Sequence, residues 1–244
     1  MEFKVEHQPS YALGIITLSN GESVRAETGA MVSMTADVEV TSGIQGGLIK
    51  SALRKFLGGE SFFVNTFTAR RDGAELTVAP TLPGDIRALE LRGRDVYVQS
   101  GSYLAGAATV DVDIKWGGAR SFFASEGLFL LRLSGTGPVL LSSYGAIHRV
   151  RLDGRRPYIV DTGHVVAFDA SLEWSVRKVA GLFTSLISGE GLVCEFRGTG
   201  ELWLQTRSSQ AFLDWLIPRL PTAKAGSGGR DLGSSIIGNL LRGE

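Results

Sequence analysis

The chain has 244 residues, of which 32 are glycine and 43% are hydrophobic, and its 25 basic side chains are balanced by 25 acidic ones. The hydrophobic content is enough to bury a core and excludes general disorder, and the balanced charge gives no overall attraction to nucleic acid or anionic lipid. A single cysteine, Cys194, excludes an intrachain disulfide and a cysteine-based zinc site. We expect a cytoplasmic protein, because no apolar leader opens the sequence and no window approaches the roughly 18 apolar residues of a membrane-spanning helix.

Three stretches of the chain repeat one pattern, in which a glycine turn leads into a strand with alternating apolar residues. The aligned glycines are Gly29, Gly101 and Gly163. A second set of glycine turns, Gly73, Gly137 and Gly200, precedes further alternating strands. Because two elements recur in the same order three times, the sequence predicts three β units of about 65 residues, each unable to bury its inner face alone.

The predicted fold class is all-β, mainly strands with short helical insertions, and the repeats form one unit shaped like a barrel or a sandwich around a pseudo-threefold axis. The Asn20-Gly21 and Asp72-Gly73 pairs predict tight hairpins, since both tolerate positive φ. We expect one three-repeat domain followed by a Gly/Ser linker and a short amphipathic C-terminal helix. The expected boundaries are 1–85, 86–150 and 151–221 for the repeats and 222–244 for the linker and helix.

Insertions interrupt the first and third repeats with helical periodicity. Residues 48–57 and 176–187 each carry an apolar stripe beside basic residues, which predicts two amphipathic helices. These helices either cap the β-structure with their apolar faces or present them to a membrane surface or a partner. The residues that would make such contacts, including those of the C-terminal helix, are Leu48, Leu53, Phe56, Leu57, Phe183, Ile187, Ile236 and Leu240.

The sequence carries no recognisable catalytic motif. No two of the three histidines lie within five residues of each other, so no closely spaced histidine ligand pair exists. The glycine-rich run that ends in Lys50 and Ser51 has Ile49 where a phosphate loop needs glycine. His164 stands where the other repeats have Ala30 and Ser102, and we interpret it as a structural histidine. We therefore expect no enzyme, no cofactor and no metal site, and we do not expect nucleic-acid binding.

Three further stretches resemble a known family. Glu27–Val32, the glycine-rich insertion that ends in Gly58–Phe63, and Leu82–Ile86 are similar to the mitochondrial-biogenesis family called "altered inheritance of mitochondria", which has uncharacterised bacterial members. The resemblance covers about residues 1–220. It implies a TRAP-like architecture of three pseudo-symmetric β repeats, often assembled into oligomers, and it supplies no catalytic residues.

Three functions follow from these observations. The first is a non-catalytic binding or scaffold protein, a homo-oligomer for which we guess a trimer, whose insertions pack internally or contact a protein partner or a membrane surface. The second is a small-ligand-binding β module with its pocket at the repeat interface, and the third is an enzyme that uses dispersed carboxylates and His164. A closed, dry repeat junction would favour the scaffold, and a concave pocket with convergent polar groups would favour the ligand-binding module.

Overall fold

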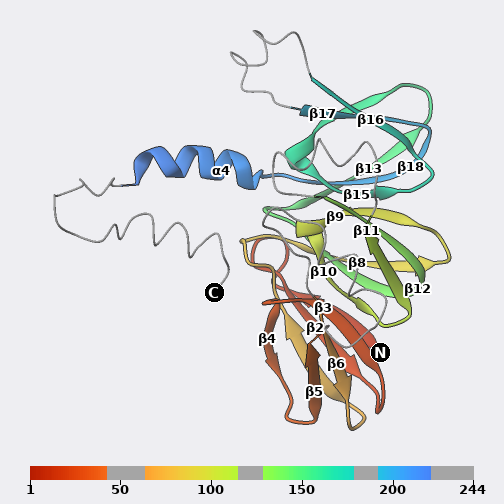
Figure 1. Cartoon of the computed structure of the whole chain (residues 1–244), viewed down its shortest axis with the longest axis vertical. Coiled ribbons are helices and arrows are strands. Elements are labelled where there is room, and N and C mark those ends of the chain that lie inside the picture. The colour runs from red at the N-terminus through yellow and green to blue at the C-terminus, as the bar shows by residue number, and fades with distance from the viewer. Residues whose placement is uncertain (43–63, 115–128, 179–191, 221–244) are drawn as a thin grey trace.

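The computed structural model describes residues 1–42, 64–114, 129–178 and 192–220, and these are mostly β-strands with one short α-helix. Figure 1 shows three units in a row along the long axis, with the N-terminal unit at the bottom and the C-terminal unit at the top. The predicted all-β fold with three repeats is confirmed. The first unit contains β1 (Glu2–Glu6), β2 (Leu13–Leu18), β3 (Ser23–Glu27), β4 (Met31–Met34), β5 (Val38–Ser42), β6 (Val64–Ala69) and β7 (Ala74–Val78).

The second and third units follow the same plan, and a short helix comes after the last strand. The second unit contains β8 (Ile86–Arg92), β9 (Val96–Gln99), the 3₁₀ turn η2 (Ser100–Ser102), β10 (Tyr103–Ala107), β11 (Val110–Ile114) and β12 (Leu130–Ser142). The third unit contains β13 (Ile147–Asp153), β14 (Tyr158–Asp161), the turn η4 (Thr162–His164), β15 (Val165–Asp169), β16 (Glu173–Lys178), β17 (Leu192–Arg197) and β18 (Thr199–Gln205). The helix α4 (Ser209–Leu216) and the turn η5 (Ile217–Arg219) end the described chain.

Every unit consists of two half-sheets with antiparallel pairing. Half-sheet A is β2–β7–β4 in the first unit, β8–β12–β10 in the second and β13–β18–β15 in the third. Half-sheet B is β3–β6–β5, β9–β12–β11 and β14–β17–β16 in the same order. The repeat extends to local irregularities, because the strand after the aligned glycine has a register shift at the same place in each unit, between Met31 and Ser33 in β4 and at the equivalent positions of β10 and β15.

Strand β12 serves both half-sheets of its unit, whereas the first and third units use two separate strands. The strand changes direction at Gly135, which has φ of +100°. A Cβ atom at this position would lie 2.5 Å from the carbonyl oxygen of Thr109, so a side chain cannot be accommodated. Because of this glycine, one long strand takes the central position in both half-sheets of the second unit, whereas in the first unit β6 and β7 each occupy one.

The units are joined by strand pairing and by their linkers. Half-sheet A of each later unit continues half-sheet B of the preceding one, through β10–β3 and β15–β9. The linkers between units lie side by side, since the amide of Asp85 donates to the carbonyl of Gly145 over 3.0 Å. Gly84 makes this approach possible, because a Cβ atom there would lie 1.6 Å from the carbonyl oxygen of Ser143. The stretch Leu82–Ile86 noted in the sequence therefore meets the second linker, around Gly145, where the units are joined.

The core lies between the half-sheets of each unit, as the alternation of apolar residues in the strands requires. In the third unit, the buried ring of Phe168 contacts the rings of Tyr97, Trp174 and Phe196 at centroid distances of 5.3, 5.6 and 5.0 Å. Tyr97 belongs to the second unit, so this aromatic cluster also seals the joint between the two units.

Several expectations need a more exact form. The units are sandwiches and follow one another in a row, so within the described residues they do not close around an axis. The expected boundary at residue 150 falls inside β13, which pairs with β18 of the third unit. The hairpins at Gly21 and Gly73 are confirmed, with φ of +81° and +76°. Val176 lies in β16 and not in a helix, because the strand pairing with β17 extends past it.

Candidate functional site

A pocket of about 290 Å³ lies where the three units meet. Its walls come from the ends of β3, β9 and β18, from the linkers between units and from the start of α4. Glu27 and Gln99 each lie two positions before the aligned glycine of their unit, whereas the third unit contributes Gln205 at the end of β18. The polar residues that line the pocket include Glu27, Thr81, Gln99, Ser102, Gln205 and Ser209.

Gln99 is the most unusual of these residues. It is the last residue of β9, and only 3% of its surface is exposed. Its Nε2 has no hydrogen-bond partner among the described residues. A buried donor without an acceptor costs about 1–3 kcal/mol, so this amide group is suited to donate a hydrogen bond to a molecule inside the pocket.

Glu27 occupies the same repeat position in the first unit and also lines the pocket. Burial raises the pKa of its carboxyl group from the ordinary value of 4.5 to about 7. Near neutral pH the group is therefore divided between the acid, which donates a hydrogen bond, and the carboxylate, which accepts one. The pocket lining thus combines the Gln99 amide, which donates hydrogen bonds through Nε2, with the Glu27 carboxyl group, which can donate or accept.

Gln205 connects the pocket wall to the third unit. Its Nε2 donates to the carbonyl of Gly163 over 2.8 Å, and its Oε1 accepts from the amide of Tyr144 over 3.0 Å. The Nδ1 of His164 lies 2.7 Å from the carbonyl oxygen of Gln205. Because that oxygen can only accept, Nδ1 is the donor, and His164 holds the wall in place as the structural histidine that we expected.

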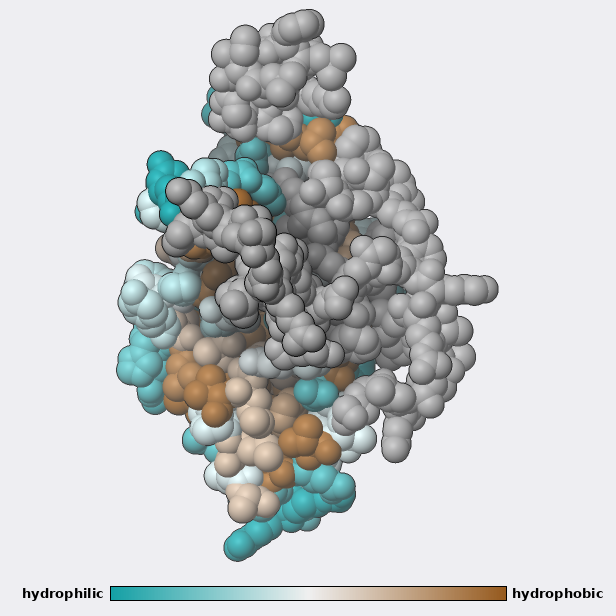
Figure 2. All heavy atoms as spheres, turned by 60° about the vertical axis from the view of Figure 1, so that its left-hand side comes forward, coloured by the Kyte–Doolittle hydropathy of each residue, from teal (hydrophilic) through white to brown (hydrophobic). Residues whose placement is uncertain are grey.

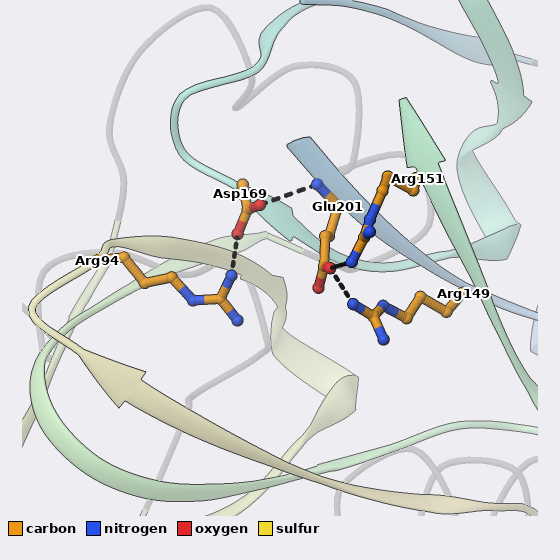
Figure 3. A network of polar contacts seen from close by, with 5 residues as sticks. All are labelled: Arg94, Arg149, Arg151, Asp169 and Glu201. Atoms are coloured by element: carbon orange, nitrogen blue, oxygen red, sulfur yellow. Dashed lines mark hydrogen bonds and ion pairs between the residues drawn. The ribbon is translucent and has the colours of Figure 1, made fainter. Parts of the chain in front are cut away.

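A second polar feature lies at the joint between the second and third units (Figure 3). Glu201 accepts from Arg149 and from Arg151, the latter over 3.1 Å, and its amide donates to Asp169 over 2.8 Å. Arg94 forms an ion pair with Asp169 at 3.3 Å. The hydrogen bond from Arg149, followed by that from Arg151, lowers the pKa of the Glu201 carboxyl group. Three arginines thus share two carboxylates, so this network is primarily structural.

The candidate contact residues of the insertions and of the C-terminal helix lie outside the described residues. They are Leu48, Leu53, Phe56, Leu57, Phe183, Ile187, Ile236 and Leu240. Within the described part of the chain, no group of three or more histidine, cysteine, aspartate or glutamate residues could hold a metal ion. The described helices also include none that is long and apolar enough to cross a membrane.

Sequence analysis missed Glu27 and Gln99, although a signal was present. The residue two positions before the aligned glycine is Glu27, Gln99 or Asp161, so it is polar but different in each repeat. A polar position that varies within an otherwise similar repeat indicates specialisation. Helix α4 was also missed, although the Ser208 hydroxyl accepts a hydrogen bond from the amide of Ala211 as a helix N-cap does.

Comparison with known proteins agrees with this architecture. Residues 3–207, from β1 to just beyond β18, match the family model described as mitochondrial biogenesis AIM24. The chain belongs to the AIM24 family. An AIM24 relative, an uncharacterized protein of Streptococcus pyogenes serotype M6, is 32% identical over 231 residues, which cover 91% of this chain and 92% of that protein. The crystal structure of protein SPYM3_0169 from Streptococcus pyogenes has a TM-score of 0.75 and 29% identity, covering 90% of this chain and 99% of that one. The expected family resemblance is confirmed, and AIM24 membership accounts for the fold.

Proposed function

We propose that this AIM24 family member is a non-catalytic binding protein that holds a small polar molecule in the pocket between its repeats. The observation that carries the proposal is Gln99, which lines the pocket and whose buried Nε2 has no hydrogen-bond partner among the described residues. A bound carbonyl, carboxylate or phosphate oxygen would accept from this group and remove the cost of burying it. Of the functions considered from the sequence, this favours the ligand-binding module.

The pocket restricts the ligand further. Its volume of about 290 Å³ is at the lower end of the range for small-molecule sites, which favours a compact molecule. Near neutral pH, Glu27 can pair with a donor or an acceptor, so the second polar group of the ligand need not be charged. The proposal involves no catalytic step and retains the expected cytoplasmic location.

The proposal can be tested by NMR on the side-chain amide signal of Gln99, assigned by its loss in the Gln99→Leu variant. The protein is titrated separately with acetate, acetamide and inorganic phosphate. We expect at least one of these probes to shift the Gln99 signal in a saturable manner. The amide signal of Gln210, which is exposed on α4, is the control and should not move. If no probe shifts the Gln99 signal more than the Gln210 signal, the proposal is wrong.

A further inference from the structure

The two joints inside the chain are built identically. In the first, Ala105 of β10 is opposite Ala26 of β3, and in the second, Ala167 of β15 is opposite Val98 of β9. In both joints, the residue four positions after the aligned glycine of one unit (Gly101 or Gly163) is opposite the residue three positions before the aligned glycine of the preceding unit (Gly29 or Gly101). The same pairing thus recurs with the repeat. Each unit has one strand that can pair with the preceding unit and one that can pair with the following unit.

Each joint combines half-sheet A of one unit with half-sheet B of the preceding unit into a six-stranded sheet. Two half-sheets are left over, namely half-sheet A of the first unit and half-sheet B of the third. Their outermost strands on the joint side are β4 and β14, and neither has a second neighbouring strand among the described residues. Strands β5, β11 and β16 are edges in all three units, whereas β4 and β14 lack the partner that their repeat equivalents have across a joint.

The side chains of β4 differ from those of an ordinary edge strand. Met31, Val32 and Met34 are 44%, 58% and 40% exposed. At the equivalent positions of the second unit, Tyr103 and Leu104 are 1% and 0% exposed, because β10 is covered on both sides. Figure 2 shows hydrophobic surface over the lower part of this face, where the first unit lies. Exposed edges of soluble proteins are usually protected by charges or proline, and β4 contains neither.

Strand β14 has matching properties at the other end of the molecule. Ile159 is 52% exposed and stands at the repeat position of Tyr97, whose ring packs on Phe168 across the second joint. Arg156 stands at the repeat position of Arg94, which forms an ion pair across that joint. Within the described residues, Arg156 itself has no ion pair.

We propose that β4 of one copy pairs antiparallel with β14 of a second copy and so forms a third joint between chains. The internal joints fix its register, which places Ser33 opposite Val160 and Met34 opposite Ile159. The pair Met34–Ile159 takes the place of the apolar pair Phe168–Tyr97.

The two edges belong to units at opposite ends of the row, so the contact is head to tail. Such a contact leaves one free edge at each end until a ring closes, or else it continues as a filament.

The test uses the full chain and two variants that each block one edge. Met34→Lys places a charge on β4, and Ile159→Lys places one on β14. In light scattering coupled to size-exclusion chromatography, we expect the unmodified protein to have a mass of two or more chains. Each variant alone should have the mass of one chain. An equimolar mixture should have the mass of two chains, because each variant retains the edge that the other has lost.

A matched control and a register test complete the design. Val40→Lys charges an exposed residue of β5, an edge in every unit, and should leave the assembly unchanged. Mixed Met34→Cys and Ile159→Cys variants should form a disulfide-linked pair, while Val40→Cys mixed with Ile159→Cys should not; Cys194 is buried and does not interfere. Circular dichroism would verify that each variant is folded. The proposal is overturned if the unmodified protein is monomeric at every concentration, if either lysine variant assembles as the unmodified protein does, or if the mixture remains monomeric.

Discussion

The raised pKa of Glu27 makes a quantitative prediction about stability. In the unfolded chain the carboxyl group loses its proton near the ordinary pKa of 4.5, whereas in the folded protein it keeps the proton up to about pH 7. Between these values the folded state binds more protons, so the free energy of unfolding falls as pH rises, by about 1.4 kcal/mol per pH unit. Over the whole interval the loss is about 3 kcal/mol, and it is complete above about pH 7.

The Glu27→Gln variant removes this titration while keeping a side chain of similar size. We expect its stability relative to the unmodified protein to increase by about 3 kcal/mol between about pH 4.5 and pH 8. Urea unfolding followed by tryptophan fluorescence at several pH values would measure the difference. Glu75→Gln, which changes an exposed glutamate of the same unit, is the control and should show no such trend. A difference for Glu27→Gln that stays constant within about 0.5 kcal/mol over this range would refute the reasoning.

Three further predictions concern packing and charge. The Gly84→Ala variant should lower the free energy of unfolding by more than about 3 kcal/mol, because its Cβ would overlap the carbonyl of Ser143. At Gly93 no atom lies within 4 Å, so Gly93→Ala should lower it by only about 1–2 kcal/mol, for the positive φ alone. Phe168→Ala should cost about 3–5 kcal/mol in urea unfolding, since it removes the buried centre of an aromatic cluster. A double-mutant cycle between Arg149→Ala and Glu201→Gln should give a coupling of only about 0.2–1 kcal/mol, because the guanidinium group is partly exposed; a larger value would mean that the network is more than a surface ion pair.

Much of the fold could be predicted because its signals are local. The Asn20-Gly21 and Asp72-Gly73 turns and the alternating strands are determined by neighbouring residues, and the recurrence of these signals revealed the three units. Which edge of one unit meets which edge of the next could not be predicted, since it depends on pairing between segments far apart in the sequence. The orphan amide of Gln99 could not be predicted for the same reason, because its burial results from all three units together.

One repeat position links the pocket to the assembly. Glu27 and Gln99 line the pocket, whereas Asp161 does not and instead accepts the amide hydrogen of Gly163 at 2.8 Å. If β4 of a second copy paired with β14, Asp161 at the end of β14 would lie at a joint between two units, as Gln99 does at the end of β9. Since the Asp161 side chain is already satisfied, the new joint would contain no unpaired donor at this position. The pocket is therefore expected once per chain, and calorimetric titration should give one ligand per chain in the assembled protein and in the edge-blocked variants alike.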